Sequence, residues 1–174
     1  AMILAVASCL SLAVGASAAN TTTRKATDFR DYDRTAWYAE AVSAAVDNGL
    51  LYGKSSSIID PNGDMTRAEM AAIINRSFGC YAKADISKYK DVSKDKWYFE
   101  DVAMAVQMGT YNGRSNTAMA PDAPITRQEA MTVVARALEL DYDAYAKTDL
   151  SAFSDRDKIS AWALPYVRSM VGSG

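Results

Sequence analysis

An internal repeat constrains the fold of this 174-residue chain more than any other feature. Trp37 and Tyr38 recur as Trp97 and Tyr98, an offset of 60 residues (97 − 37). Because the offset is constant over many positions, we infer two copies of one structural unit with no net insertion between them. The other landmarks that share this offset are Ala45 and Ala105, Gly49 and Gly109, Gly53 and Gly113, Pro61 and Pro121, Thr66 and Thr126, Glu69 and Glu129, and Arg76 and Arg136.

A third copy begins near the carboxyl end of the sequence. Phe153 and Asp155 repeat an aromatic-x-Asp start, and Trp162 precedes Val167 by five positions, as the matching residues do in both earlier copies. No counterpart of the later landmarks follows, so we expect a third unit that lacks its second half. The expected layout is a unit at 29–80, a linker at 81–88, a unit at 89–140, a linker at 141–152 and a partial unit at 153–174.

Both halves of each unit have the pattern of an amphipathic helix. In the first half, Tyr38, Val42, Ala45 and Gly49 follow the 3.6-residue period with one apolar face. The second half opens on Thr-Arg-x-Glu, which fits a capping box. Apolar stripes follow, formed by Met70, Ile73, Ile74, Ser77 and Phe78 in one copy and by Ala130, Val133, Val134, Ala137 and Leu138 in the other. The sequence therefore predicts an all-α fold with helices near 36–48, 66–78, 96–108, 126–138 and 160–171.

The segment between the two helices of a unit is rich in Gly, Ser, Asn and Pro, which indicates an irregular connection. Ile59 and Met119 are its apolar points, and we expect them to hold the loop against the core. A single helix–loop–helix unit could not cover its own apolar faces. We therefore expect neighbouring units to pack on one another.

The composition argues against several functions. The chain has no histidine, which removes the most common general base and a common metal ligand. The net charge is -2, and no basic stripe of the kind typical of nucleic-acid binding is present. A calcium loop at Asp60, Asn62 and Asp64 is disfavoured, because Met65 stands where an EF-hand requires glycine. No cofactor is predicted.

The first 18 residues have the character of a secretory signal peptide. An apolar run from Met2 to Val14 leads to Ala16-Ser17-Ala18, the small-x-small pattern that signal peptidase cuts. The positively charged start is absent, so we expect the sequence to begin inside the signal. The alternatives are a buried apolar helix and, ranked lower, a lipoprotein signal with Val6-Ala7-Ser8-Cys9 as its lipobox. After removal of the signal, we expect a flexible polar segment at 19–28, no integral membrane span, and Cys80 as the only cysteine.

Taken together, these landmarks resemble the S-layer homology (SLH) motif. The resemblance rests on the aromatic-x-Asp start, Trp-Tyr, Gly-x-x-x-Gly, the loop with proline and Thr-Arg-(Ala/Gln)-Glu. It covers residues 29–76 and 89–136 and, in part, 153–174. It implies three helical motifs in a pseudo-threefold arrangement. It also implies a function: such domains hold exported proteins on the bacterial cell wall or S-layer by binding secondary cell-wall polysaccharide on peptidoglycan, often pyruvylated, in grooves between motifs.

The resemblance points to candidate glycan-binding residues. Arg67 and Arg127 belong to the repeated tetrapeptide and would stand at the first position of their helices. A carboxylate there would meet the guanidinium fork, free backbone N–H groups and the positive end of the helix dipole. The further candidates are the aromatic residues Trp37, Trp97 and Trp162, the glycine turns Gly53 and Gly113, and the adjacent basic residues Lys54 and Arg114.

Each assignment has a structural alternative. An arginine at a helix start is often only solvated, a tryptophan on an amphipathic helix is often core, and a glycine often serves only a turn. The capping box accounts for Glu69 and Glu129 without any role in binding. For the whole chain, the function predicted is non-catalytic anchoring. The alternative is an anchoring segment of a cell-wall-active enzyme whose catalytic domain lies outside this chain.

Overall fold

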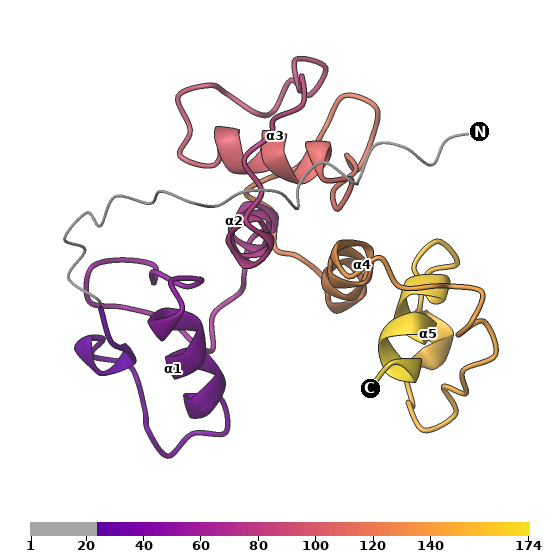
Figure 1. The fold of residues 1–174 in the computed structure, drawn as a ribbon, viewed down its shortest axis with the longest axis horizontal. Coiled ribbons are helices and arrows are strands. Elements are labelled where there is room, and N and C mark those ends of the chain that lie inside the picture. Colours follow the sequence, from indigo (N-terminus) through magenta and orange to yellow (C-terminus); the bar gives the residue numbers. More distant parts are fainter. Residues whose placement is uncertain (1–23) are drawn as a thin grey trace. The chain divides into compact units, whose positions relative to one another are not determined.

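A computed structural model describes residues 24–174, in which the regular elements are helices joined by long loops (Figure 1). Within this range no β-strand forms, so the predicted all-α class is confirmed. The signal peptide predicted at 1–18 lies outside the described residues. The elements are η1 (Ala26–Asp28), α1 (Ala39–Asp47), α2 (Arg67–Phe78), α3 (Phe99–Gln107), α4 (Arg127–Ala137), η2 (Arg156–Lys158) and α5 (Leu164–Gly172).

The second helix of each unit begins where the sequence predicts, because its capping box forms. The Thr66 hydroxyl accepts a hydrogen bond from the backbone N–H of Glu69 (3.2 Å), and the Glu69 carboxylate accepts one from the backbone N–H of Thr66 (2.8 Å). Thr126 and Glu129 form the same reciprocal pair at 3.3 and 2.8 Å. The helices α1, α3 and α5 instead begin three or four residues later than predicted, because turns occupy the residues before them.

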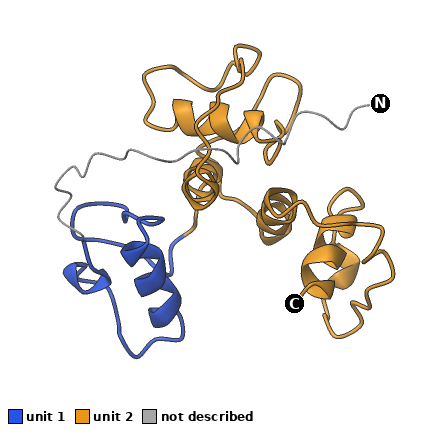
Figure 2. Ribbon diagram, in the orientation of Figure 1, with its two compact units in different colours: residues 1–63 blue, residues 64–174 orange. Residues whose placement is uncertain are grey.

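The chain divides into two compact units, residues 1–63 and residues 64–174 (Figure 2). The boundary falls inside the first sequence repeat and places α2 in the second unit. There α2 packs against α3, and α4 packs against α5. A packing unit therefore combines the second helix of one repeat with the first helix of the next. The pseudo-threefold arrangement of motifs stays a prediction.

The first unit has a small core of its own. Phe29, Val46 and Ile59 are buried together with Ala26, which belongs to the short helix η1. Of the flexible segment predicted at 19–28, residues 19–23 lie outside the described residues, whereas residues 26–28 form a 3-10 helix and Ala26 packs into this core. The sequence does not reveal this contact, because the residues around Ala26 are mostly polar and one small apolar side chain does not indicate a buried position.

The second unit has two cores. The larger one gathers Tyr98, Val102 and Met119 around the junction of α2 and α3. The smaller one is built from Leu150 and Val167 and lies where α4 meets α5. Among residues 24–174, no helix has the length and apolar character needed to cross a membrane.

The buried face of α2 differs from the predicted stripe. Ser77 and Phe78 are exposed, whereas Ala71 and Asn75 are buried. In α4, Leu138 is likewise exposed just beyond the helix end. The buried face of α2 is wider than predicted because α2 contacts both α3 and α4, which cover small residues on two sides of the helix.

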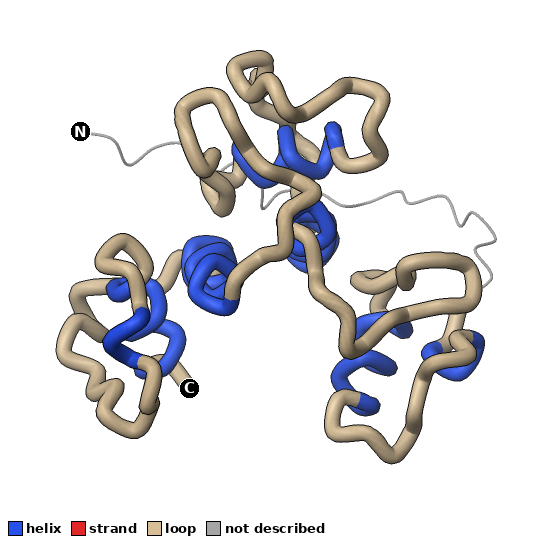
Figure 3. Tube along the Cα trace, turned by 180° about the vertical axis from the view of Figure 1, so that it is seen from behind, coloured by secondary structure: helices blue, strands red, loops and turns tan. Residues whose placement is uncertain are grey.

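Long loops rather than helices form most of the path between α1 and α2 and between α3 and α4 (Figure 3). Their predicted apolar anchors are confirmed, because Ile59 and Met119 are both buried. An aspartate from each repeat start also fixes the loop. The Asp91 carboxylate accepts hydrogen bonds from the backbone N–H groups of Met119 (2.9 Å) and Ala120 (2.7 Å), and Asp31 holds Ile59 and Asp60 in the same way.

Candidate functional site

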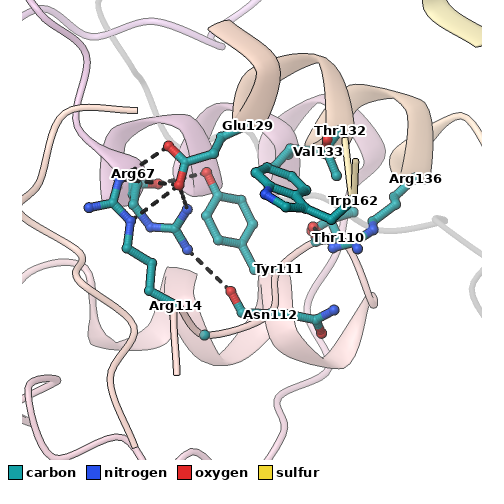
Figure 4. Close-up of a pocket in the computed structure, with 11 residues that line it drawn as sticks. Arg67, Thr110, Tyr111, Asn112, Arg114, Glu129, Thr132, Val133, Arg136 and Trp162 are labelled. Carbon is teal, nitrogen blue, oxygen red and sulfur yellow. Dashed lines mark hydrogen bonds and ion pairs between the residues drawn. The ribbon is translucent and has the colours of Figure 1, made fainter. Parts of the chain in front are cut away.

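A pocket of about 530 Å³ opens on the surface of the second unit (Figure 4). Three segments that are distant in the sequence build it: the start of α2, the chain directly after α3, and α4, with Trp162 added from the turn before α5. We refer to it below as the groove. Its lining residues are Arg67, Thr110, Tyr111, Asn112, Gly113, Arg114, Glu129, Thr132, Val133, Arg136 and Trp162.

Arg67 lies at the base of the groove and is only 5% exposed. Its Nε donates to the backbone carbonyl of Met119 (3.0 Å), its Nη2 donates to that of Asn112 (3.2 Å), and its Nη1 donates to Glu129 (3.1 Å). The Tyr111 ring lies 5.1 Å from the guanidinium, and the Tyr111 hydroxyl donates to the Arg67 carbonyl. The structure therefore makes Arg67 a buried anchor of the loop after α3. The sequence-based prediction was an accessible glycan-binding arginine at the start of its helix, with a solvated helix start as the alternative.

Glu129 joins two arginines across the groove. Besides capping α4, its carboxylate accepts from Arg67 and from both Nε and Nη2 of Arg114, each at 3.2 Å. The capping box therefore does not account for Glu129 fully, contrary to expectation. Burial raises the pKa of Glu129, but hydrogen bonds from Arg114 and Thr126 and the charge of Arg67 outweigh it and hold the pKa below its usual value.

Arg136 lies at the other end of the groove. Its Nη2 donates to the hydroxyl of Tyr166 (3.1 Å) and its Nη1 reaches the backbone carbonyl of Thr110 (3.5 Å). The guanidinium carbon lies 4.7 Å from the centre of the Tyr166 ring, within the range of a cation–π contact. Within the described part of the chain, no carboxylate pairs with Arg136.

The groove is strongly cationic for a chain whose net charge is -2. Three guanidinium groups line it, from Arg67, Arg114 and Arg136, and Glu129 is the one carboxylate among the lining residues. Its local charge is therefore about +2 (3 − 1), since arginine stays protonated in proteins. Such a concave, cationic surface favours an anionic ligand.

Sequence reasoning missed Arg136 as a site residue, although it identified the position as a repeat landmark. The signal was present: Glu129, Thr132, Val133 and Arg136 stand at i, i+3, i+4 and i+7 and so share one face of α4. The sequence-based prediction for this helix considered only its apolar residues. The polar residues of the same face line the groove.

The three predicted tryptophans are all exposed, so the core alternative is wrong for each. Trp162 is 52% exposed and lines the groove beside Val133 (Figure 4). Trp37 and Trp97 are 91% and 59% exposed, and neither lines a pocket described here. The structure therefore brings one of the three candidate aromatic side chains into the groove.

The two candidate glycines have structural roles. Gly53 has φ +83°, and a Cβ there would lie 2.5 Å from the Phe29 ring. At Gly113, a Cβ would lie 2.5 Å from the Tyr89 ring and 2.7 Å from the carbonyl oxygen of Ala118. Each glycine thus allows close approach of its loop to the aromatic residue that opens the repeat. Lys54 follows Gly53 as an exposed residue of the first unit.

Arg127 is exposed and does not reach the groove. It lines a second pocket of about 320 Å³, together with Phe153, Lys158 and Val171. The two arginines of the repeated tetrapeptide therefore belong to separate places in the second unit. Arg67 contacts the loop of the following repeat, and Arg127 faces the partial third one.

A family model for the S-layer homology domain matches residues 28–71 and 88–131. A surface-layer 125 kDa protein of Lysinibacillus sphaericus is 33% identical over 150 residues, which is 86% of this chain and 12% of that protein. A cellulosome-anchoring protein of Acetivibrio thermocellus is 26% identical over 133 residues (72% of this chain, 29% of that protein). An endoglucanase of Bacillus sp. (strain KSM-635) is 26% identical over 165 residues (93% and 17%). The chain thus spans less than a third of each relative. The chain belongs to the S-layer homology domain family.

Proposed function

We propose that this chain is a non-catalytic module that anchors an exported protein to the bacterial cell surface by binding an anionic cell-wall polysaccharide in the groove. The observation that carries the proposal is the local charge of about +2 beside an exposed tryptophan (3 − 1 over the lining residues). Relatives described as surface-layer and cellulosome-anchoring proteins support the surface location.

The lining residues suit a charged sugar. The indole of Trp162 offers a flat apolar face for the C–H side of a pyranose ring, while Asn112 presents an exposed carboxamide for hydroxyl groups. Guanidinium groups bind carboxylates with two parallel hydrogen bonds, which fits an acidic substituent such as a pyruvate ketal. The polymer we propose is therefore a secondary cell-wall polysaccharide that carries carboxylates, with pyruvylation as one form.

The same comparison supports a proposal for what the module anchors. Matching relatives include an endoglucanase and an exoglucanase in which the matched region is 17% and 13% of the protein. We propose that this chain tethers a larger protein whose activity lies outside it. As the alternative, that larger protein is a cell-wall-active enzyme.

A pull-down with isolated cell-wall sacculi tests the proposal. The protein should co-sediment with intact sacculi, and binding should fall when the secondary polymer is extracted or the salt concentration is raised. The variant Trp162→Ala should bind more weakly, whereas Tyr81→Ala, which removes an exposed aromatic ring outside both pockets, should bind like the parent. Equal retention on extracted sacculi would assign the partner to peptidoglycan itself and overturn the proposal.

A further inference from the structure

We propose that the groove binds the acidic group of its ligand at Arg136, with Tyr166 as the positioning residue, and not at Arg67 or Arg114. This inference rests on the proposed function and names the carboxylate-binding part of the same site. It departs from the sequence-based assignment, which gave that role to the arginines of the repeated tetrapeptide. Three observations on the arginines of the groove support it.

The first observation is that Arg67 is committed to the protein. Its donors reach two backbone carbonyls and Glu129, and the side chain is almost fully buried. A ligand carboxylate could displace these contacts only by taking the Arg67 donors away from the two carbonyls and from Glu129. That loss would offset the new bond, because unpaired buried acceptors and charges are strongly unfavourable.

The second observation is that the donors of Arg114 are already engaged. Its Nε and Nη2 form a two-pronged contact with the two oxygens of Glu129. This is the geometry with which a guanidinium would otherwise clasp a ligand carboxylate. A second carboxylate at this end would also lie close to the negative charge of Glu129. The Glu129 end of the groove is therefore poorly suited to an acid.

The third observation is that Arg136 keeps its charge and most of its donors. Arginine has five N–H groups, and the two contacts made here go to uncharged acceptors, the Thr110 carbonyl and the Tyr166 hydroxyl. A neutral partner fixes the guanidinium without cancelling its charge. The remaining N–H groups can meet a carboxylate at little desolvation cost, since the residue is only half-buried.

An aromatic brace holds Arg136 in place before any ligand arrives. The Tyr166 ring contacts the guanidinium as well as accepting its hydrogen bond, and Tyr142 packs edge-on against Tyr166 with ring centres 4.7 Å apart. A side chain fixed in this way loses less rotamer freedom on binding, which favours affinity. In Figure 4 the Trp162 indole lies between the Glu129 cluster and Arg136. A sugar ring on this indole would have Arg136 on one side and the Glu129 cluster on the other, and the contacts of Arg67 and Arg114 leave Arg136 as the side suited to an acidic substituent.

The test compares two probes with the whole chain: purified secondary cell-wall polymer, and the same polymer after its carboxyl groups are reduced to alcohols. The parent should bind the native polymer at least about tenfold more tightly than the reduced one, as expected for a charge-assisted bond. Arg136→Gln should bind both polymers with the affinity that the parent has for the reduced one. Arg136→Lys should recover part of the preference, and Arg156→Gln, outside both pockets, should keep all of it.

Tyr166→Phe separates a positioning role from a structural one. It keeps the ring over Arg136 and removes the hydroxyl, so the preference for carboxylate should fall by a few-fold while binding of the reduced polymer is unchanged. Thermal melts accompany every variant. If Arg136→Gln is unfolded, Arg136→Lys and Tyr166→Phe provide the test. An undiminished preference for the native over the reduced polymer in both variants would overturn the inference.

The remaining outcomes separate this inference from the proposed function. If Arg114→Gln abolishes the preference and Arg136→Gln keeps it, the acid binds at the Glu129 end; the inference is then wrong and the proposed function stands. Equal binding of native and reduced polymer by the parent would overturn the inference and also the anionic character of the ligand in the proposed function. If the parent binds neither polymer, the proposed function itself fails.

Discussion

Arg67 and Arg127 occupy the same position of the repeat, yet they differ in what surrounds them. Arg67 is enclosed by the loop after α3 and pairs with Glu129, whereas Arg127 is exposed at the second pocket. The sequence shows that both begin a helix but contains no sign of which loop, if any, will cover the side chain. Burial of Arg67 follows from packing between repeats, which a motif of four residues does not encode.

We predict that Arg67→Ala destabilises the fold, while Arg127→Ala leaves it almost unchanged. Removing Arg67 takes away one of the two positive charges that balance the Glu129 carboxylate and leaves two backbone carbonyls without their Arg67 donors. This should lower the free energy of unfolding by about 3–5 kcal/mol. Arg127→Ala should stay within about 0.5 kcal/mol of the parent, as is usual at an exposed position. Urea denaturation measures both. Equal stability of the two variants would show that the Arg67 contacts contribute nothing net.

Glu129 should make the stability of the second unit sensitive to acid. Its pKa is held below the usual value in the folded chain, so the unfolded chain binds a proton first as the pH falls. The contribution is complete above the unfolded pKa of about 4.3 and is lost as the pH falls through the lower folded value. Melting temperatures between pH 7 and pH 3 should therefore drop below about pH 4 by more in the parent than in Glu129→Gln. Parallel curves for the two proteins would contradict this assignment.

The helices are the elements that the sequence predicts best. The 3.6-residue period and the two capping boxes place α2 and α4 within one residue of their observed bounds. The starts of α1 and α3 were predicted too early, because Trp37 and Trp97 continue the apolar pattern although turns hold them outside the helix. Periodicity identifies a helix, but it does not tell an apolar residue that packs in the core from one that the turn before the helix exposes.

The loop between α3 and α4 depends on Met119 as its apolar anchor. Met119 is 1% exposed, and the loop that it fixes supplies the carbonyls that hold Arg67. Met119→Ala should therefore lower the free energy of unfolding by about 2–5 kcal/mol, the range for a buried methionine truncated to alanine. The matched variant Met65→Ala removes a partly exposed side chain from the same class of loop and should cost much less. Chemical denaturation of both variants checks the difference.

At the scale of the whole molecule, the sequence repeat and the packing unit are out of phase. The repeat of 60 residues was visible in the sequence as helix–loop–helix, but the fold joins α2 of the first repeat to α3 of the second. The groove is a consequence of this shift, because it unites residues from Arg67 to Trp162. The residue types at repeat positions predicted an anion site. Which segments of the chain come together to form the groove is visible only in the fold.

The division at residues 63 and 64 leads to a prediction about the isolated second unit. Its two cores are built from residues of that unit, and the lining of the groove lies between Arg67 and Trp162. A fragment of residues 64–174 should therefore fold with a cooperative melt and should keep the preference of the whole chain for the native over the carboxyl-reduced polymer. The first unit contributes Trp37, Gly53 and Lys54, which the sequence assigned to glycan binding. If the fragment folds but loses the polymer, residues of the first unit rather than the groove carry the affinity, because the fragment retains every lining residue of the groove.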